Sequence, residues 1–458
     1  MENLKGRLEK VLKFYNEGRT RSYNFRKIQL QVLRTAIQEN EAVIHEALYS
    51  DLKKSPEESW ITETGLVVSS INHALSNLKK WMKPENVPTN LLNFPSSSYI
   101  YKEPLGVVLI IGPWNYPLQL ILMPLIGAMA AGNCAVLKPS EMAPATSQVL
   151  QKIIEANFTS EYILMVQGDG EKIVPELMNS FRFAHVFFTG GLNAGRAIYK
   201  MAADQLIPVT LELGGKSPCV VEADANIKLA AKRIAVSKFS NAGQMCVTPD
   251  YVLVHESVKE KLVEALIKTI KVFYTEDASS SYHFGTIINE KHFDRLEKYL
   301  AQGKILYGGN ADRSKKYIQP SLIEGVDLAS PIMQEEIFGP ILPIISFKNF
   351  DEARNIILQN PDPLAFYIFT QSRKKEKQWL ASISFGGGCV NNVSWHLTNL
   401  NLPFGGRGNS GIGAYHGKYS FDLFTHNKAV MKSPTWFDPP IKYPPFKGKL
   451  NLFKKIIR

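Results

Sequence analysis

The segment GVVLIIGPWNYPLQLILMPLIGAMAAGNCAVLKP, residues 106–139, has the pattern of a strand, a helix and a second strand. Residues 106–112 form a short apolar run rich in Val and Ile, which is typical of a buried strand. Residues 118–131 are long enough for a helix, and residues 135–137 are again strand-like. Two apolar runs joined by a helix indicate a βαβ unit in a parallel sheet.

No charged residue stands between Pro104 and Leu137, and a membrane-spanning helix also needs ~20 apolar residues. Three internal prolines and three side-chain amides interrupt this segment. Because proline breaks regular helices, we expect a buried strand, turn and helix here rather than a membrane span.

The same alternation of strand-like and helical segments continues along the chain. Strand-like runs lie at residues 162–166, 185–188, 220–221, 251–254, 341–345 and 366–369 and at Val390, and helical segments at 143–157, 228–239 and 258–272. We therefore predict an α/β fold with two Rossmann-like parallel-sheet domains and a small β element for bridging or oligomerisation.

Composition restricts the class of protein. The 458-residue chain has 53 Lys and Arg against 42 Asp and Glu, a formal net charge of +11. This excess favours anionic partners, but no nucleic-acid-reading motif is present, so we expect no nucleic-acid partner. The four cysteines are far apart in the sequence. We expect no metal site, no disulfide framework and a reducing, cytoplasmic location.

Two segments pair a nucleophile with a base. Cys246 ends the segment FSNAGQMC, and Glu212 follows the apolar alternation of residues 209–211. A thiol normally titrates near ~8.5, so a neutral-pH enzyme needs a base within reach of it. A strand end can direct one carboxylate into a cleft, and the pair indicates covalent catalysis.

Two further turns suit a dinucleotide. Thr189 and Gly190 join a strand to a helix, where free backbone N–H groups bind pyrophosphate, although glycines also end many strands. Lys138 and Glu141 follow another strand. Glu141 at this place would bind ribose hydroxyls and repel a 2′-phosphate, or it would only stabilise a helix N-terminus.

The turn between residues 112 and 117 contains Trp-Asn-Tyr, which no simple packing rule explains. The amide of Asn115 is a candidate donor to an oxyanion, and the neighbouring aromatic side chains are candidates for the wall of a substrate channel. A purely structural role for Asn115, as an ordinary turn residue, explains the sequence equally well.

Taken together, these segments resemble the NAD(P)-dependent aldehyde dehydrogenase superfamily, and especially its class 3 branch for fatty and aromatic aldehydes. The family motifs appear in order as PWNYP (113–117), KPSE (138–141), FTG (188–190), LELGGK (211–216), GQMC (243–246), EEIFGP (335–340) and LPFGG (402–406). The class 3 resemblance also depends on NSGIGAYHGK (409–418) and KYPP (442–445).

The resemblance implies the chemistry. Cys246 would attack the aldehyde carbon to form a thiohemiacetal, and Asn115 with the backbone N–H of Cys246 would hold the oxyanion. Hydride transfer to the cofactor would leave a thioester, which water activated by Glu212 would hydrolyse to a carboxylate. The cofactor-binding residues implied are Lys138, Glu141, Thr189, Gly190, Leu213, Glu336 and Phe338. The cofactor would be NAD, with NADP as an alternative.

The resemblance also implies a domain arrangement and a homodimer. Residues 1–80 and 104–211 would form the NAD(P)-binding domain, residues 212–417 the catalytic domain, and residues 81–103 and 418–458 the bridging segments and tail. Tyr116, Trp395, Phe404 and Leu397 would line an apolar channel for medium- or long-chain aliphatic or aromatic aldehydes.

Several alternatives stay open at this level. A CoA-acylating aldehyde dehydrogenase would pass the thioester to a thiol, and a non-catalytic nucleotide-binding scaffold would need only the basic surface. Gly191 stands where many relatives have a polar residue, and Arg407 has no assigned role. His416 is either structural or a tunnel residue, and the other three cysteines are expected to be structural.

The tail KLNLFKKIIR, residues 449–458, places Leu450, Phe453 and Ile457 on one helical stripe with cations opposite. A basic amphipathic helix of this kind suits peripheral contact with an anionic membrane, a lid over the substrate channel, or packing on a second subunit.

Overall fold

The strand–helix–strand pattern of residues 106–139 is confirmed by the computed structural model, which describes residues 4–457. β3 (Val107–Ile111) and β4 (Cys134–Lys138) pair in parallel, and α6 (Gln119–Ala131) crosses between them. Every residue of α6 is buried, so this charge-free segment is a helix enclosed by protein on all sides. Among the described residues, no helix has both the length and the apolar character needed to span a membrane.

β3 lies inside the first sheet, because the chain adds strands on both sides of it. The strand order is β17–β7–β6–β3–β4–β5. The added strands are β5 (Ile163–Met165), β6 (His185–Thr189), β7 (Val209–Glu212) and β17 (Gly411–Ile412). All neighbours are parallel except β17, which is antiparallel to β7. The reversal of strand order beside β3 is where doubly wound sheets bind ligands.

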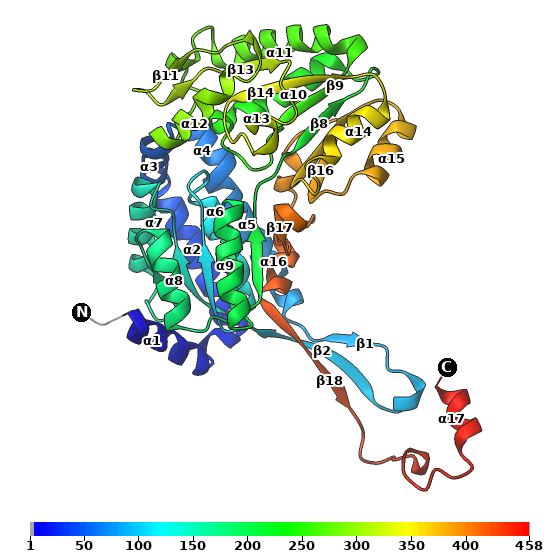
Figure 1. The fold of residues 1–458 in the computed structure, drawn as a ribbon. Coiled ribbons are helices and arrows are strands. Elements are labelled where there is room, and N and C mark those ends of the chain that lie inside the picture. Colours follow the sequence, from blue (N-terminus) through cyan, green and yellow to red (C-terminus); the bar gives the residue numbers. More distant parts are fainter. Residues whose placement is uncertain (1–3, 458) are drawn as a thin grey trace.

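Helices surround this sheet (Figure 1). They are α1 (Leu4–Asn16), α2 (Tyr23–Glu39), α3 (Glu41–Leu52), α4 (Pro56–Ser59), α5 (Gly65–Trp81), α7 (Pro144–Asn157), α8 (Gly170–Ser180), α9 (Leu192–Asp204) and α16 (Gly417–Leu423). α6 packs against α2, α5 and α16, and α3 packs against α7. Between Leu4 and Trp81 the chain is made of helices α1 to α5 and short helical turns.

The parallel strands of this sheet end together. Ile111 of β3 lies opposite Lys138 of β4 and Phe188 of β6, and Thr189 lies opposite Glu212 of β7. The loops that follow these four strands therefore leave the sheet at one edge, which is its carboxyl edge.

The second sheet has the order β10–β13–β14–β9–β8–β15–β16. Its strands are β8 (Pro218–Val221), β9 (Tyr251–His255), β10 (Lys304–Tyr307), β13 (Ser321–Glu324), β14 (Ile341–Phe347), β15 (Ala365–Phe369) and β16 (Gly387–Val390). Only the pairing of β10 with β13 is antiparallel. Its helices are α10 (Ile227–Phe239), α11 (Lys259–Tyr274), α12 (Glu290–Leu300), α13 (Pro331–Gln334), α14 (Phe350–Leu358) and α15 (Arg373–Ser382). Two parallel-sheet units are thus present.

Some elements were not predicted from the sequence. The edge strand β10 is mostly exposed and β13 has only four residues, so neither has a long apolar run. The small hairpin of β11 (Ala311–Asp312) and β12 (Tyr317–Ile318) is shorter still. β17 lies within residues 212–417 yet joins the first sheet, because its partner β7 supplies the hydrogen bonds.

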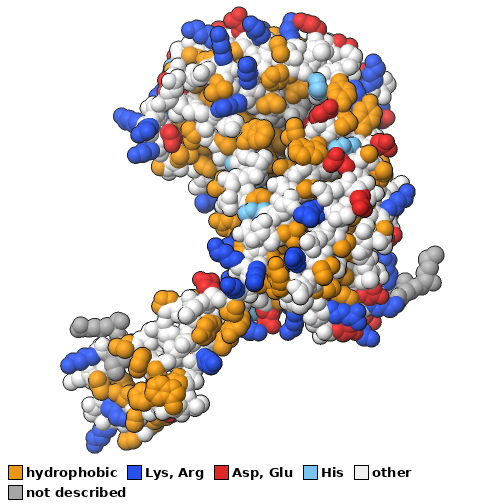
Figure 2. Space-filling view, turned by 180° about the vertical axis from the view of Figure 1, so that it is seen from behind, with side chains coloured by type: hydrophobic (Ala, Val, Ile, Leu, Met, Phe, Trp, Pro, Cys, Tyr) orange, Lys and Arg blue, Asp and Glu red, His pale blue; other side chains and the backbone are white. Residues whose placement is uncertain are grey.

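A three-stranded arm projects from the first unit (Figure 1). It pairs β1 (Glu85–Val87), β2 (Ser97–Pro104) and β18 (Thr425–Lys432) in antiparallel fashion, and the chain ends in α17 (Leu450–Ile456). Apolar side chains gather at the end of the arm (Figure 2), where Trp436 is 80 % exposed. The remaining short helical turns are η1 (Arg19–Arg21), η2 (Trp60–Thr64), η3 (Leu91–Asn93), η4 (Ser240–Gly243), η5 (Glu256–Val258), η6 (Ala278–Ser280), η7 (Trp395–Thr398), η8 (Gly408–Ser410) and η9 (Pro440–Lys442).

Candidate active site

Cys246 lies at the amino end of the second sheet. β8 and β9 are parallel, so α10 returns the chain across the sheet before β9 begins. In the turn η4 that precedes the cysteine, Asn241 and Ala242 have φ values of 48° and 51°. Non-glycine residues seldom occupy this left-handed region, and such strained turns are concentrated at functional sites.

Asn115 reaches this turn from the first unit, in the loop that follows β3. Its side-chain Nδ2 donates to the carbonyl of Gln244 at 3.0 Å, two residues before Cys246. The Nδ2 of Asn241 donates back to the carbonyl of Asn115 at 2.9 Å. Both asparagines are buried. These hydrogen bonds join the two units and hold the Asn115 amide beside the loop that carries the cysteine.

Glu212 is the last residue of β7, as the sequence predicted. The side chain is buried, and neither carboxylate oxygen has a hydrogen-bond partner among the described residues. Burial raises the pKa of this carboxyl well above its ordinary value. Glu212 therefore keeps its proton to higher pH than an exposed glutamate, and is a stronger base once ionised.

The Cys246 thiol is partly buried and lines the apolar cavity described below. Burial raises its pKa, and the nearby carboxyls of Glu336 and Glu212 raise it further. In this environment the thiol is protonated at neutral pH, so forming the nucleophilic thiolate requires a base.

An apolar cavity of about 610 Å³ leads from the protein surface to Cys246, a volume within the usual range for ligand pockets. The predicted channel residues Tyr116, Trp395, Leu397 and Phe404 all line it. The sequence did not point to the other lining residues, which include Ile61, Leu66, Leu120, Val236, Val272, Phe273 and Tyr415. Except for Tyr415, which bridges to Phe404 and stands in the segment 409–418 quoted above, these side chains come from helices and helical turns of both units, where their apolar character matched ordinary core positions.

A second, larger cleft of about 1330 Å³ follows the carboxyl edge of the first sheet. The predicted residues Lys138, Glu141, Thr189, Gly190 and Glu336 line it. The Thr189 hydroxyl is buried without a hydrogen-bond partner among the described residues. The first residues of α9, Leu192 to Ala194, also line the cleft, and the free N–H groups of a helix start suit a phosphate. The cleft therefore fits a dinucleotide.

At one end of this cleft, Lys138 and Glu141 form an ion pair. The other carboxylate oxygen of Glu141 accepts from the N–H of Gly170 at 3.2 Å, at the start of α8. The hydrogen bond with Lys138 lowers the pKa of Glu141 against the opposing effect of burial, which is the largest single influence on it. A fixed anionic carboxylate at this position suits ribose hydroxyls.

Glu336 stands on a loop whose backbone is held by three charged side chains. Arg295 donates to the carbonyls of Glu336 at 3.2 Å and Ile337 at 2.7 Å. Asp250 accepts from the N–H of Ile337 at 3.0 Å, and Lys216, paired with Asp250, donates to the carbonyl of Glu335 at 2.9 Å. Burial raises the pKa of Glu336 to about 8.

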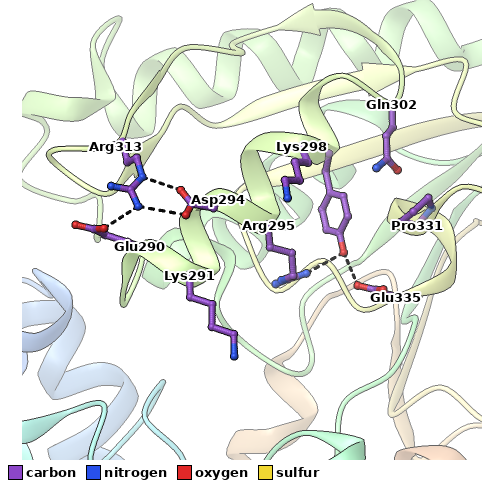
Figure 3. Close-up of a pocket in the computed structure, with 10 residues that line it drawn as sticks. Glu290, Lys291, Asp294, Arg295, Lys298, Gln302, Arg313, Pro331 and Glu335 are labelled. Atoms are coloured by element: carbon purple, nitrogen blue, oxygen red, sulfur yellow. Dashed lines mark hydrogen bonds and ion pairs between the residues drawn. The ribbon is translucent and has the colours of Figure 1, made fainter.

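Arg295 belongs to a polar groove along α12 that borders the cleft (Figure 3). The groove shares Lys291 and Glu335 with the cleft. Arg295 and Glu335 lie on the side of the groove away from Arg313 (Figure 3). Arg313 forms ion pairs with Glu290 and Asp294. Through its two backbone hydrogen bonds, Arg295 of this groove supports the Glu336 loop.

Two predicted cofactor residues do not line the cleft in this structure. The Leu213 side chain packs beneath Gly195 of α9, and Phe338 packs edge-on against Trp114 at 5.3 Å. The sequence missed other cleft residues, namely Arg196, Lys216, Lys291, His292, Asn360, Asp362 and Asn409. Only Lys216 and Asn409 stood within recognised motifs, LELGGK and NSGIGAYHGK, so the sequence carried little signal for the rest.

The three other cysteines and Arg407 lie among structural contacts. Cys134 and Cys219 are fully buried in β4 and β8, where burial raises the pKa of each thiol. Cys389 lies 3.7 Å from Nδ1 of His396. Arg407 forms a 2.8 Å ion pair with Asp362 at the rim of the cleft.

Gly191 and His416 also have defined places. Gly191 precedes α9 with open space where a Cβ would stand, so the structure gives no steric reason for glycine. His416 lines the apolar cavity and stacks on Phe404 at 5.0 Å. Burial lowers the pKa of His416 to about 3, so its ring is neutral.

Comparison with known proteins identifies this arrangement. The model of the aldehyde dehydrogenase family matches residues 13–430. The chain belongs to the aldehyde dehydrogenase family. It is 47 % identical to 4,4'-diaponeurosporen-aldehyde dehydrogenase of Staphylococcus aureus, over 97 % of each chain. It is 44 % identical to human aldehyde dehydrogenase family 3 member B1, over 97 % of this chain and 95 % of the relative.

Solved structures agree with this assignment. The substrate-bound state of Staphylococcus aureus AldH superimposes with a TM-score of 0.97 at 45 % identity, over 100 % of both chains. Two more distant structures hold cofactors, each with a TM-score of 0.84. Glyceraldehyde-3-phosphate dehydrogenase GapN of Methanocaldococcus jannaschii holds NADP, at 26 % identity over 94 % of each chain. An indole-3-acetaldehyde dehydrogenase holds NAD+, at 25 % identity over 93 % of this chain and 88 % of that one. The protein is thus an NAD(P)-dependent aldehyde dehydrogenase related to class 3.

The raised pKa values of Glu212 and Cys246 predict a pH dependence. Both groups are protonated at low pH and act as base and nucleophile only when deprotonated. We expect no ascending limb of kcat/KM for aldehyde oxidation in the ordinary range of carboxyl groups, and a rise with pH through the neutral and alkaline range. Initial rates of NADH formation across this range test it. A rate that is constant across this range would contradict the assigned environment.

Proposed function

We propose that this enzyme oxidises medium- or long-chain aliphatic or aromatic aldehydes to carboxylates by covalent catalysis at Cys246. One observation carries the proposal. Cys246 lines the apolar cavity, the Asn115 amide is hydrogen-bonded to its loop two residues away, and the Glu212 carboxyl is near enough to raise the pKa of the thiol. Each group has the chemistry that one step of the reaction needs.

In the first step the Cys246 thiol releases its proton to base from the solvent, and the thiolate sulfur attacks the aldehyde carbon and forms a C–S bond. The carbonyl oxygen gains the electron pair of the C=O bond. This oxyanion accepts hydrogen bonds from the side chain of Asn115 and the backbone N–H of Cys246. Because Asn115 is already fixed by the Gln244 loop, its amide needs little reorganisation to stabilise the charge.

When bound in the cleft, NAD(P)+ would supply the acceptor for the hydride that leaves the thiohemiacetal carbon, so that a thioester is left on Cys246. On the protein side, Lys138 and Glu141 would hold the adenosine ribose, and Thr189, with the start of α9, the pyrophosphate. Glu336 would position the nicotinamide ribose. Leu213 and Phe338 support these contacts by packing beneath α9 and against Trp114.

Glu212 completes the cycle by taking a proton from water, which attacks the thioester carbon. The C–S bond breaks, the carboxylate leaves and the sulfur is regenerated. A positioned base of raised pKa favours water as the acceptor over a second thiol such as CoA, because a thiol of lower pKa does not need that base.

The cavity sets the substrate class. Its lining is mostly apolar, so an aliphatic chain or aromatic ring leaves water on binding while the aldehyde group reaches the sulfur. The Staphylococcus aureus relative is named for 4,4'-diaponeurosporen-aldehyde. We infer that long apolar aldehydes are the better substrates of this chain also.

The assigned roles predict different fates for two variants. Cys246→Ala should abolish NADH formation from octanal, because no covalent intermediate forms. Glu212→Gln should still acylate but deacylate at least ~10²-fold more slowly. Intact-mass spectrometry after mixing with NAD+ and octanal should then show the octanoyl adduct only in the glutamine variant. Cys389→Ala is the matched control and should turn over normally. Ordinary oxidation by the Cys246 variant would contradict the mechanism.

The cavity lining predicts an effect of chain length. Leu120 is buried in the wall of the cavity. Leu120→Trp fills the cavity, so kcat/KM for dodecanal should fall at least ~10-fold, and kcat/KM for propanal less than ~3-fold. Leu120→Met keeps the volume and is the control. Equal losses of kcat/KM for both aldehydes would mean that the alkyl chain of the substrate does not bind in this cavity.

We also propose a homodimer assembled through the projecting arm. β1 and β18 are the outer strands of its sheet, and β18 is exposed along nearly its whole length. Exposed strand edges and apolar side chains such as Met431 and Phe437 favour association with a second copy.

The tail is proposed to lie on an anionic membrane surface. In α17, Leu450 is 63 % exposed, as is Ile457 beyond it, and Phe453 contacts Phe446 at 5.7 Å. Arg458 lies outside the described residues. Lys449, Lys454 and Lys455 supply the positive charge that attracts anionic headgroups.

Removal of residues 447–458 tests the membrane proposal. We expect the full chain to sediment with vesicles containing anionic phospholipid, and the shortened chain to remain in the supernatant. Neutral vesicles control for charge, and light scattering of both forms reports whether the dimer persists. Equal sedimentation of both forms would contradict the proposal.

A further inference from the structure

Lys54 and Glu63 form a fully buried ion pair that lies outside the catalytic groups. Their side chains are both 0 % exposed, with Nζ and Oε1 2.7 Å apart. Removing two charges from water costs several kcal/mol per ion and is tolerated only when the partners satisfy each group. The hydrogen bonds of this pair therefore show what the pair supports.

Among the described residues, the second hydrogen bond of the Lys54 ammonium goes to the loop that carries Asn115, and the Glu58 carboxyl also feels its charge. Besides Glu63, its ammonium donates to the carbonyl of Asn115 at 2.9 Å. It also lies 3.8 Å from the centre of the Tyr116 ring, a distance at which a desolvated cation is attracted to the ring face. The three donors of the ammonium are thus directed at one carboxylate and two consecutive residues of this loop.

Glu63 holds the other end of the same loop. Its Oε1 accepts from Lys54, and its Oε2 accepts from the backbone N–H groups of Leu118 and Gln119, each at 3.0 Å. These N–H groups belong to the start of α6, which has no side-chain cap of its own. The carboxylate therefore serves as the cap of this helix from a distant part of the chain.

The local backbone places Glu63 for this task. Residues Trp60–Thr64 form a π-helical turn between α4 and α5, and such insertions are frequent at functional sites. The N–H of Gly65 closes the turn on the carbonyl of Trp60. A Cβ at position 65 would lie 2.6 Å from that oxygen, so the turn requires glycine.

We propose that Lys54 and Glu63 are positioning residues that set the place of the Asn115 amide beside Cys246. The inference rests on the proposed role of Asn115. The carbonyl and the side chain of Asn115 belong to one residue, so movement of its backbone moves the amide. A displacement of ~1 Å in a catalytic group can lower the rate by ~10²-fold. Neither Lys54 nor Glu63 contacts the substrate or the cofactor in the proposed mechanism.

The test is a double-mutant cycle on kcat with octanal and NAD+. Lys54→Met should lower kcat by ~10-fold or more in the wild-type background, but by less than ~2-fold when Asn115 is already alanine. A purely structural lysine would give the same loss in both backgrounds. The Lys54→Met/Glu63→Gln variant removes both charges and keeps an oxygen acceptor for Leu118 and Gln119, so it covers the case in which Lys54→Met alone is unstable.

Two readouts separate positioning from general damage. Alkylation of Cys246 by iodoacetamide forms no oxyanion, so its rate should stay within ~2-fold of wild type in every variant. The KM for NAD+ should also change by less than ~2-fold. Lys375→Met is the matched control, because it breaks the 2.7 Å ion pair with the buried Glu222 away from both cavities. It should leave kcat unchanged.

The outcomes are distinct. Equal losses in the two backgrounds, or a fall in alkylation parallel to kcat, would overturn the proposal. Unchanged kcat in the folded double-charge variant would overturn it as well. If wild type oxidises octanal but Asn115→Ala does so equally well, the assigned oxyanion role fails instead. A fall in kcat alone for Lys54→Met, which disappears when Asn115 is already alanine, supports the proposal.

Discussion

Parallel pairing around β3 is the constraint on which this site depends. β3, β4, β6 and β7 are in register and end at one edge of the first sheet. Asn115, Glu141 and Gly190 follow β3, β4 and β6, and Lys138, Thr189 and Glu212 are the last residues of β4, β6 and β7. A one-residue shift in any pairing would turn the side chains of that strand to the opposite face. Hydrogen bonding within the sheet therefore determines which side chains can share a cleft.

The second unit meets this edge with its own loops. Cys246 and Glu336 precede β9 and β14, which are neighbours in the second sheet, so both loops emerge at its amino end. The hydrogen bond from Asn115 to Gln244 crosses between the units. Catalysis thus requires the two sheets to be docked, because neither contains a complete set of groups.

Buried charges recur where loops must be held. Lys216 with Asp250 holds the Glu336 loop, and Lys54 with Glu63 holds the Asn115 loop. In each pair, part of the hydrogen-bonding capacity goes to backbone groups rather than to the partner charge. Replacement of such pairs by apolar side chains would relieve desolvation, but it would leave those backbone groups unsatisfied. Burial excludes water around Cys246 and Glu212 and so raises the pKa of both groups. The same exclusion of water strengthens the hydrogen bonds of the buried ion pairs.

The sequence by itself determined the α/β class and the strands around residues 106–139, and it named Cys246, Glu212 and Asn115 as candidate catalytic residues, because apolar periodicity and short motifs are local properties. Only the tertiary structure decided that β17 returns to the first sheet and that β18 forms an arm with β2, since exposed strands carry no apolar alternation. It also decided the roles of Lys54, Glu63 and Arg295. From the sequence, a single charged residue in a helical segment is expected to be exposed to solvent. The partners of these three side chains include distant backbone groups, and because every residue has a backbone, no sequence pattern marks them.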